Sequence, residues 1–260
     1  MTNTLSDKET IKLNTLTNFN ETTSLEISGD KQVFIKKQIM EEDIPLFEKL
    51  KTINCPQIAK IYAIVKKDEK YYSIQEYING ISLDKYIEKY GCQNDDFVRL
   101  MSVQICKGLN ELHKNDVVHR DISPKNIIID EYNNIKIIDF GIARTFKQSQ
   151  TADTQILGTQ GYAAPEQFGF SQSNNKTDIY SLGVLINVLS TGKFPNEILA
   201  NGKLGKIVKK CTEIDESNRF SDVSKIENML KYNFETVRLV NNFPGFNIKS
   251  IPLKVGMLFA

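Results

Sequence analysis

The sequence predicts an α+β protein of two parts, a small β-rich N-terminal part followed by a helical C-terminal part. Short runs of β-branched and aromatic residues fill the first eighty residues, and turn-forming pairs such as Gly29-Asp30 separate them. After Gly80, apolar residues recur instead at the three- and four-residue spacing of helices. The join is therefore expected near residues 76–80, and no internal repeat or low-complexity linker interrupts the chain.

Four strands and one helix are expected in the first part. The strand-like runs are SLEIS, KQVFIKK, IAKIYAIVK and YYSIQEY, at residues 24–28, 31–37, 58–66 and 71–77. A helix over residues 43–53 interrupts them. Its apolar residues recur at helical spacing, at Leu46, Phe47, Leu50 and Ile53.

The second part is expected to begin with a long amphipathic helix over residues 94–115, which has Asp95 and Asp96 near its positive N-terminal end. Two short strands, NIIID and IKIID, follow and are joined by a turn at residues 133–134. The nearly all-apolar segment DIYSLGVLINVLSTG predicts a helix that is buried on most sides. Two further helices are expected, over residues 204–211 and 221–231.

The composition indicates an ordinary soluble globular protein, with 40% hydrophobic and 25% charged residues. A net charge of +1 argues against a general electrostatic grip on nucleic acid. The four cysteines are scattered, so disulfides are not expected and the reducing cytoplasm is the predicted compartment. No signal peptide is predicted, and no run reaches the roughly 18 apolar residues of a membrane span.

Polar side chains gather around the predicted hairpin, in the segment VVHRDISPKNIIIDEYNNIKIIDFG. A hairpin flanked by loops can hold Asp121, Asn126 and Asp139 together at one edge. Carboxylate and amide oxygens are ligands that Mg²⁺ accepts in proteins. Phosphoryl transfer needs cations on the phosphates and a positioned acceptor for the proton of the nucleophile. The segment therefore indicates phosphoryl transfer.

Four motifs, HRDISPKN, DFG, GTQGYAAPE and TDIYSLG, occur in this order. In them the chain resembles the eukaryotic-type protein kinase family, and more closely its bacterial Ser/Thr kinases. The resemblance covers roughly residues 25–231. It implies a two-lobed fold with ATP in the cleft. The expected divisions are an N-terminal lobe at residues 1–78, a helical lobe at residues 79–232 and a docked tail at residues 233–260.

The resemblance implies a role for each polar residue of the hairpin region. Asp121 resembles the catalytic base that accepts the proton of the substrate hydroxyl. Asn126 and Asp139 resemble the Mg²⁺ ligands. Lys125 is expected to reach the γ-phosphate, although Ser/Thr kinases of the family usually place this lysine two residues after the base, where this chain has Ser123.

The resemblance also implies which residues bind ATP. Lys36 best matches the lysine of the third strand, with Lys37 as the alternative, and Glu48 is the candidate acid that pairs with it. Gln75 would be the gatekeeper beside the hinge. The other expected nucleotide contacts are the backbones of Glu76 and Ile78, together with Ile128, Asn126 and Asp139.

The N-terminal part departs from the family in its phosphate-covering loop. The segment NFNETTS stands where a glycine-rich loop would let backbone N–H groups approach a phosphate. Phe34 occupies the place of a small residue over the adenine. Weak ATP affinity is therefore expected.

The resemblance further implies supporting and regulatory roles. Glu166 is expected to pair with Arg219, and Asp178 to brace the backbone of the catalytic loop. His119 and Phe140 are expected to pack beside the site, and His113 to lie at a helix end. Arg120 is expected to bind a phosphate on Thr151 or Thr154, and Thr159 to mark Ser/Thr specificity.

The favoured function is a Ser/Thr protein kinase that uses ATP and Mg²⁺, phosphorylates a protein hydroxyl and autophosphorylates through self-association. The main alternative is a pseudokinase that signals by binding a nucleotide or partner. A small-molecule phosphotransferase is a third interpretation, and GTQGYAAPE argues against it because such enzymes need no peptide-positioning segment. The identity of the substrate does not follow from these residues.

Overall fold

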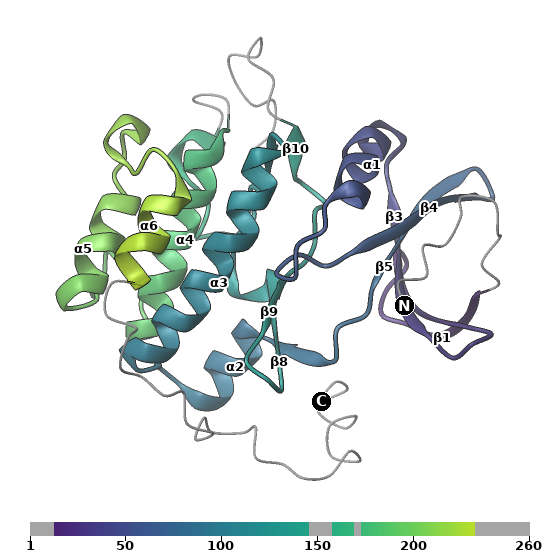
Figure 1. Ribbon diagram of the computed structural model, residues 1–260, viewed down its shortest axis with the longest axis horizontal. Helices are drawn as coiled ribbons and strands as arrows, with labels where there is room; N and C mark the ends of the chain where they lie inside the picture. The colour runs from purple at the N-terminus through teal and green to yellow at the C-terminus, as the bar shows by residue number, and fades with distance from the viewer. Residues whose placement is uncertain (1–12, 146–157, 169–172, 232–260) are drawn as a thin grey trace. The chain divides into compact units, whose positions relative to one another are not determined.

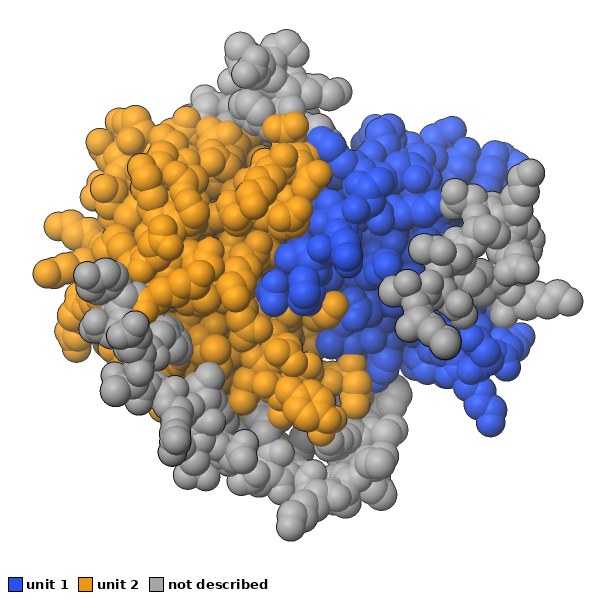
Figure 2. Space-filling model, viewed as in Figure 1, with its two compact units in different colours: residues 1–78 blue, residues 79–260 orange. Residues whose placement is uncertain are grey.

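The computed structural model describes residues 13–145, 158–168 and 173–231. The chain divides into two compact units, residues 1–78 and residues 79–260, which Figure 2 colours separately. Each unit is described by itself. The expected tail, residues 233–260, lies outside the described residues.

The first unit is built on a five-stranded antiparallel sheet with the strand order β1-β2-β3-β5-β4 (Figure 1). The strands are β1 (Leu13–Asn18), β2 (Thr23–Ser28), β3 (Val33–Ile39), β4 (Ile61–Lys67) and β5 (Lys70–Glu76). Four of them were predicted. The strand β1 was not predicted, because its largely polar, exposed residues lack an apolar face and it becomes a strand by pairing with β2.

Tight turns and one helix complete this unit. Asp68 and Glu69 both have positive φ, 48° and 59°, which matches the right-handed twist of the hairpin between β4 and β5. The helix α1 (Ile44–Thr52) has a proline in its first turn, where the missing N–H costs nothing. It packs on β4 and buries Leu46, Phe47 and Leu50, as the helical spacing predicted.

The second unit is mainly helical. Its helices are α2 (Leu83–Tyr90), α3 (Asp95–Lys114), α4 (Asn175–Thr191), α5 (Gly202–Cys211) and α6 (Val223–Lys231). Its strands form the sheet β6-β8-β9, of β6 (Gly80–Ser82), β8 (Ile127–Asp130) and β9 (Ile135–Ile137), and the pair of β7 (Val117–Val118) with β10 (Arg144–Thr145). The predicted hairpin and long helices are confirmed. The short helix α2 was not predicted.

The core of the second unit forms where α3 packs against α4 and α6, and α4 against α5 (Figure 1). The helix α4 is buried on most sides, as its apolar sequence predicted. Gly183 allows α4 to approach α5 closely, because a Cβ atom there would lie 2.3 Å from the Cβ of Cys211. Among the helices within the described ranges, none combines the length and apolar character needed to cross a bilayer.

Candidate active site

The buried carboxylate of Asp178, on α4, anchors the loop that carries Asp121. Asp178 is fully buried and accepts the backbone N–H of His119 at 2.9 Å and of Arg120 at 2.8 Å. Arg120 has a φ of +70°, a conformation that non-glycine residues rarely adopt. The two hydrogen bonds help hold this loop in its unusual backbone path. The predicted bracing role of Asp178 thus agrees with the geometry.

His113 supports Asp178 from the last turn of α3. Its Nε2 lies 2.8 Å from Asp178 Oδ2. Burial alone would raise the pKa of Asp178, but the hydrogen bond from His113, the charges of His113 and His119 and the His119 N–H outweigh it, so the pKa lies below its usual value. The carboxylate therefore stays ionised in a dry environment. His113 lies at a helix end, as predicted, but its contact with Asp178 was not predicted.

His119 is structural, as predicted. Its ring is buried and packs edge-on against Phe140, with centroids 5.3 Å apart. The backbone N–H of Asp121 lies 3.3 Å from His119 Nδ1, and His119 Nε2 lies 3.1 Å from the carbonyl oxygen of Ile138. The ring links the loop to the end of β9.

The carboxylate of Asp121 is held at both oxygens. Oδ1 accepts the N–H of Thr159 at 2.9 Å and its hydroxyl at 2.7 Å. Oδ2 accepts Asn126 Nδ2 at 2.8 Å, and the same nitrogen donates to the carbonyl of Asp121 at 2.9 Å. Ser123 is also buried, and its Oγ lies 3.4 Å from the hydroxyl oxygen of Thr159. Two of the predicted site residues, Asn126 and Thr159, therefore contact a third, Asp121.

Asn126 and Asp139 stand at the same end of the hairpin formed by β8 and β9. Ile127 pairs with Ile137, and the N–H of Ile138 donates to the carbonyl of Asn126 at 2.9 Å. Asp139 has a φ of +63°, and its Oδ1 accepts the N–H of Gly141 at 3.0 Å. The hairpin thus brings two potential metal ligands to one edge of the sheet.

These two residues fit Mg²⁺. Because Asn126 uses its nitrogen for Asp121, its Oδ1 remains for another partner, and no donor in the described part of the chain reaches it. Within residues 13–145, 158–168 and 173–231, no three His, Cys, Asp or Glu side chains form a metal cage. Mg²⁺ is usually held by one or two protein ligands with phosphates and waters completing its shell.

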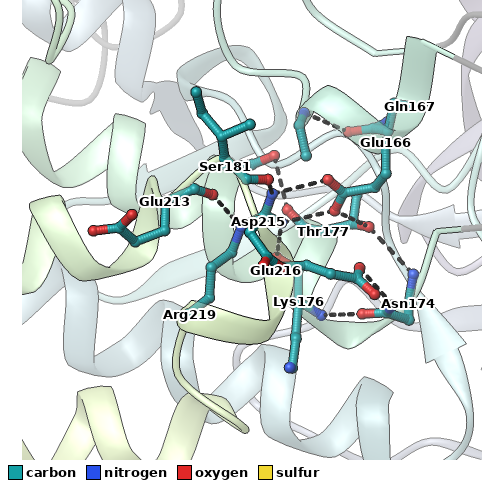
Figure 3. A network of polar contacts seen from close by, with 12 residues as sticks. Glu166, Gln167, Asn174, Lys176, Thr177, Ser181, Glu213, Asp215, Glu216 and Arg219 are labelled. Atoms are coloured by element: carbon teal, nitrogen blue, oxygen red, sulfur yellow. Dashed lines mark hydrogen bonds and ion pairs between the residues drawn. The ribbon is translucent and has the colours of Figure 1, made fainter. Parts of the chain in front are cut away.

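The segment that carries Thr159 is fastened to the helical core. Glu166 and Arg219 form a bidentate, buried ion pair at 2.7 and 2.9 Å (Figure 3). Thr177 also donates its hydroxyl to Glu166 at 2.9 Å. The predicted pairing of Glu166 with Arg219 is confirmed. Gln167, next in the chain, donates Nε2 to the carbonyl of Arg120 at 2.8 Å and ties this segment to the Asp121 loop.

In the first unit, Lys36 pairs with an acid that was not predicted. Its Nζ lies 3.6 Å from Glu26 Oε1, on the neighbouring strand β2. Glu48, the predicted partner, is exposed on α1 and makes no ion pair with Lys36. The expectation of a Lys36–Glu48 pair is therefore wrong. It failed because Glu48 lies opposite the apolar stripe that packs on the sheet.

Two other predicted residues of the nucleotide site have defined surroundings. Phe34 is buried and packs edge-on against Tyr62, with centroids 5.4 Å apart. The backbone N–H of Glu76 donates to the carbonyl of Lys60 at 2.8 Å, so an adenine contact at Glu76 would use its carbonyl oxygen. Phe34 is thus part of the core of this unit.

The remaining predicted residues are placed as follows. Lys125 is exposed and has no ion-pair partner in the described ranges. Ile128 lies on β8, opposite Lys136, and Ile78 is the last residue of the first unit. Thr151 and Thr154, the predicted phosphate acceptors, fall outside the residues that the structure describes.

The supporting contacts of three residues were not predicted, namely those of Glu26, His113 and Gln167. Each acts through a partner that is at least ten residues away in the chain. In β2, Glu26 alternates with the apolar Leu25 and Ile27 and therefore belongs to the polar face of the strand, so the sequence gives no sign that it is buried. His113 and Gln167 carry no local signal either.

Comparison with known proteins yields one family. The model of the protein kinase domain matches residues 24–237. Similar curated proteins include serine/threonine-protein kinase PrkC of Bacillus subtilis, 37% identical over 145 residues, which are 55% of this chain and 22% of PrkC. Sperm motility kinase Z of Mus musculus is 32% identical over 156 residues, which are 60% of this chain and 31% of that protein.

A third relative is a probable serine/threonine-protein kinase of Clostridium acetobutylicum, 31% identical over 193 residues, which are 65% of this chain and 29% of the relative. The chain therefore spans less than a third of the length of each of these relatives. The match to the family model covers most of the chain, including every motif that suggested the family.

Proposed function

This chain belongs to the protein kinase family, and we propose that it transfers the γ-phosphate of ATP to a serine or threonine hydroxyl of a protein. The names of its bacterial relatives, both serine/threonine kinases, support the choice of acceptor. The two-unit α+β fold is the one that the family requires. Autophosphorylation, with a second copy of the chain as substrate, is part of the proposal.

The observation that carries the proposal is the fixed orientation of Asp121. Its carboxylate is held by Thr159 at one oxygen and by Asn126 at the other. A general base must be oriented toward the proton that it accepts. The hydrogen bonds from Thr159 and Asn126 hold the carboxylate of Asp121 in one orientation, so it need not reorient during the reaction. In this proposal Asp121 takes the hydroxyl proton of the substrate as the oxygen attacks phosphorus.

The other predicted residues would hold the nucleotide. Asn126 Oδ1 and the Asp139 carboxylate would bind Mg²⁺, which supplies charge neutralisation on the phosphates. Lys125, exposed two residues beyond the buried Ser123, would contact the γ-phosphate. Lys36 would contact the other phosphates. The backbones of Glu76 and Ile78 and the side chain of Ile128 would contact the adenine.

A pseudokinase is the second candidate, and one observation favours it. The turn between β1 and β2 carries Phe19, Asn20, Glu21 and Thr22 where glycines would let the backbone approach a phosphate. Glu21 adds a negative charge to this exposed turn. A chain with this turn could bind nucleotide weakly and signal by contact alone.

We place the protein in the cytoplasm as part of the proposal. Its four cysteines, Cys55, Cys92, Cys106 and Cys211, are all free thiols, which is typical of a reducing compartment. Its partner would be a protein substrate, recognised near Thr159.

One experiment separates the enzyme from the pseudokinase. Purified protein is incubated with Mg·ATP, and added phosphate is measured by mass spectrometry in parallel with Asp121→Ala and Asp139→Ala. We expect phosphate on the wild-type chain only, because base and metal ligand act on one transition state. Equal incorporation in all three proteins would reveal a contaminating kinase. No incorporation by wild type, together with measurable nucleotide binding, would leave the pseudokinase.

A further inference from the structure

Glu26 is a buried acid in the middle of β2. Its side chain is 2% exposed, yet its Oε1 accepts the hydroxyl of Ser24 at 2.7 Å and that of Thr15, on β1, at 3.0 Å. A buried carboxylate is costly unless it is hydrogen-bonded and paired with a cation. The first unit therefore holds a buried, hydrogen-bonded acid on β2, the strand next to the edge strand β1.

The strand register brings Lys36 to this anion. On β3, Lys36 lies opposite Ser24, and Phe34 lies opposite Glu26, so Glu26 and Lys36 are diagonal neighbours on one face of the sheet. Long side chains reach across such a diagonal. The Lys36 ammonium lies 3.6 Å from Glu26 Oε1, and the Lys36 side chain is only 20% exposed.

Tyr72 completes the surroundings of Lys36. It stands on β5, the other neighbour of β3, and its ring centroid lies 4.8 Å from the Lys36 ammonium. An aromatic face attracts a cation electrostatically. The lysine is thus flanked by an acid on one neighbouring strand and by a ring on the other.

We propose that Glu26 on β2, in place of an acid on α1, is the residue that positions Lys36 for the phosphates of a nucleotide. The distance of 3.6 Å exceeds that of a hydrogen bond, so the ammonium is attracted and oriented while its N–H donors remain for a phosphate. The two hydroxyls fix the carboxylate independently of Lys36. Lys36 is therefore preorganised by the sheet, and its placement does not depend on the position of α1.

This inference depends on the proposed function in one respect only, namely that Lys36 contacts a bound nucleotide. The test measures Mg·ATP binding by calorimetry for wild type, Glu26→Gln, Glu26→Asp and Glu48→Gln, with exposed Glu42→Gln as the matched control. We expect Glu26→Gln to raise Kd about tenfold, the usual scale for loss of one charged partner. The Kd of Glu26→Asp should lie between those of wild type and Glu26→Gln, because aspartate keeps the carboxyl group on a shorter side chain. The variants of the two exposed acids, Glu48→Gln and Glu42→Gln, should bind Mg·ATP with the wild-type Kd.

A second background shows whether Glu26 acts through Lys36. In Lys36→Met protein, Glu26→Gln should cause no further rise in Kd, because the residue that it positions is gone. In nucleotide-free protein, the two substitutions should shift the thermal midpoint non-additively, which reports the contact without any activity. A separate, merely structural role of Glu26 would give additive shifts and an equal rise of Kd in both backgrounds.

The outcomes separate this inference from the proposed kinase activity. A rise of Kd on Glu48→Gln with none on Glu26→Gln would overturn the role of Glu26 and leave the kinase intact. Tighter binding by Glu26→Gln would also overturn it, since Glu26 would then sequester Lys36. The expected pattern of Kd in a chain that transfers no phosphate would retain the Glu26 role and reject the kinase. Absence of Mg·ATP binding by wild type would overturn both.

Discussion

Thr159 donates two hydrogen bonds to a single oxygen of Asp121, from its backbone N–H at 2.9 Å and from its hydroxyl at 2.7 Å. The two residues are 38 positions apart in the chain. Thr159 is thus a direct partner of the proposed base. Glu166 and Gln167 fasten the segment that carries Thr159 to Arg219 and to the backbone of Arg120.

The Thr159 hydroxyl should matter for turnover. Thr159→Val keeps the size and the backbone N–H but removes the hydroxyl, and we expect kcat to fall roughly 10- to 100-fold, the scale of a hydrogen bond to a charged group. Thr159→Ser is the matched control and should retain most activity. Initial rates with Mg·ATP and a protein substrate measure both. A fully active valine variant would show that the backbone N–H suffices.

Removal of either partner of the Glu166–Arg219 pair should destabilise the second unit. Arg219→Met leaves Glu166 buried with only the Thr177 hydroxyl, and we expect a loss of about 3–5 kcal/mol in the free energy of unfolding. The double variant Glu166→Gln/Arg219→Met should lose less than the sum of the single losses. Urea unfolding of the four proteins tests this, and strict additivity would contradict it.

Asn187 should be a second stabilising centre. It is fully buried on α4, donates Nδ2 to the carbonyls of Lys193 and Ile198, each at 2.8 Å, and accepts the N–H of Ala200 at 2.8 Å. Asn187→Ala should cost about 2–4 kcal/mol, since it leaves several backbone groups unsatisfied. Asn175→Ala, on the same helix but with one exposed hydrogen bond, should cost under about 1 kcal/mol. Equal costs in urea unfolding would contradict this account.

Acid stability should depend on His113. Because the pKa of Asp178 in the folded protein lies below its unfolded value of about 3.9, the carboxylate stabilises the fold above that pH. This stability is lost as the pH falls through the folded pKa. In His113→Phe the pKa of Asp178 should be higher, so the loss should begin at a higher pH.

Urea unfolding between pH 7 and pH 3 measures this shift. His113→Phe should also cost about 1–3 kcal/mol at pH 7, because the buried Asp178 carboxylate loses a hydrogen-bond partner. Lys114→Met, at the neighbouring exposed position, should follow the wild-type profile. Parallel profiles for wild type and His113→Phe would exclude a contribution of His113 to the pKa of Asp178.

Phosphorylation of the segment before Thr159 is expected to raise activity. A phosphate on Thr151 or Thr154 would bring nearly two negative charges to Arg120. Autophosphorylated protein should therefore outpace phosphatase-treated protein on an added substrate. Thr151→Ala/Thr154→Ala should abolish the difference, and so should Arg120→Ala. A double threonine variant as fast as the phosphorylated enzyme would reject this regulation.

The sequence by itself determined the fold class, the family and the residues of the proposed chemistry. Hydrophobic periodicity is a local property, so the helices α1, α3 and α4 and the hairpin of β8 and β9 could be predicted where they occur. Asp121, Asn126 and Asp139 follow from motifs at short spacing around that hairpin. Their proximity follows from the hairpin, because its two ends meet at one edge of the sheet.

Only the tertiary structure decided the partners of Lys36 and His113. Glu48 fits the expected helix, but the direction of the apolar stripe on α1 turns it to solvent, while the register of β2 on β3 brings Glu26 to Lys36. The contact of His113 with Asp178 depends on the packing of α3 against α4. Such contacts depend on how elements distant in sequence pack, and no local pattern encodes a register or a helix crossing.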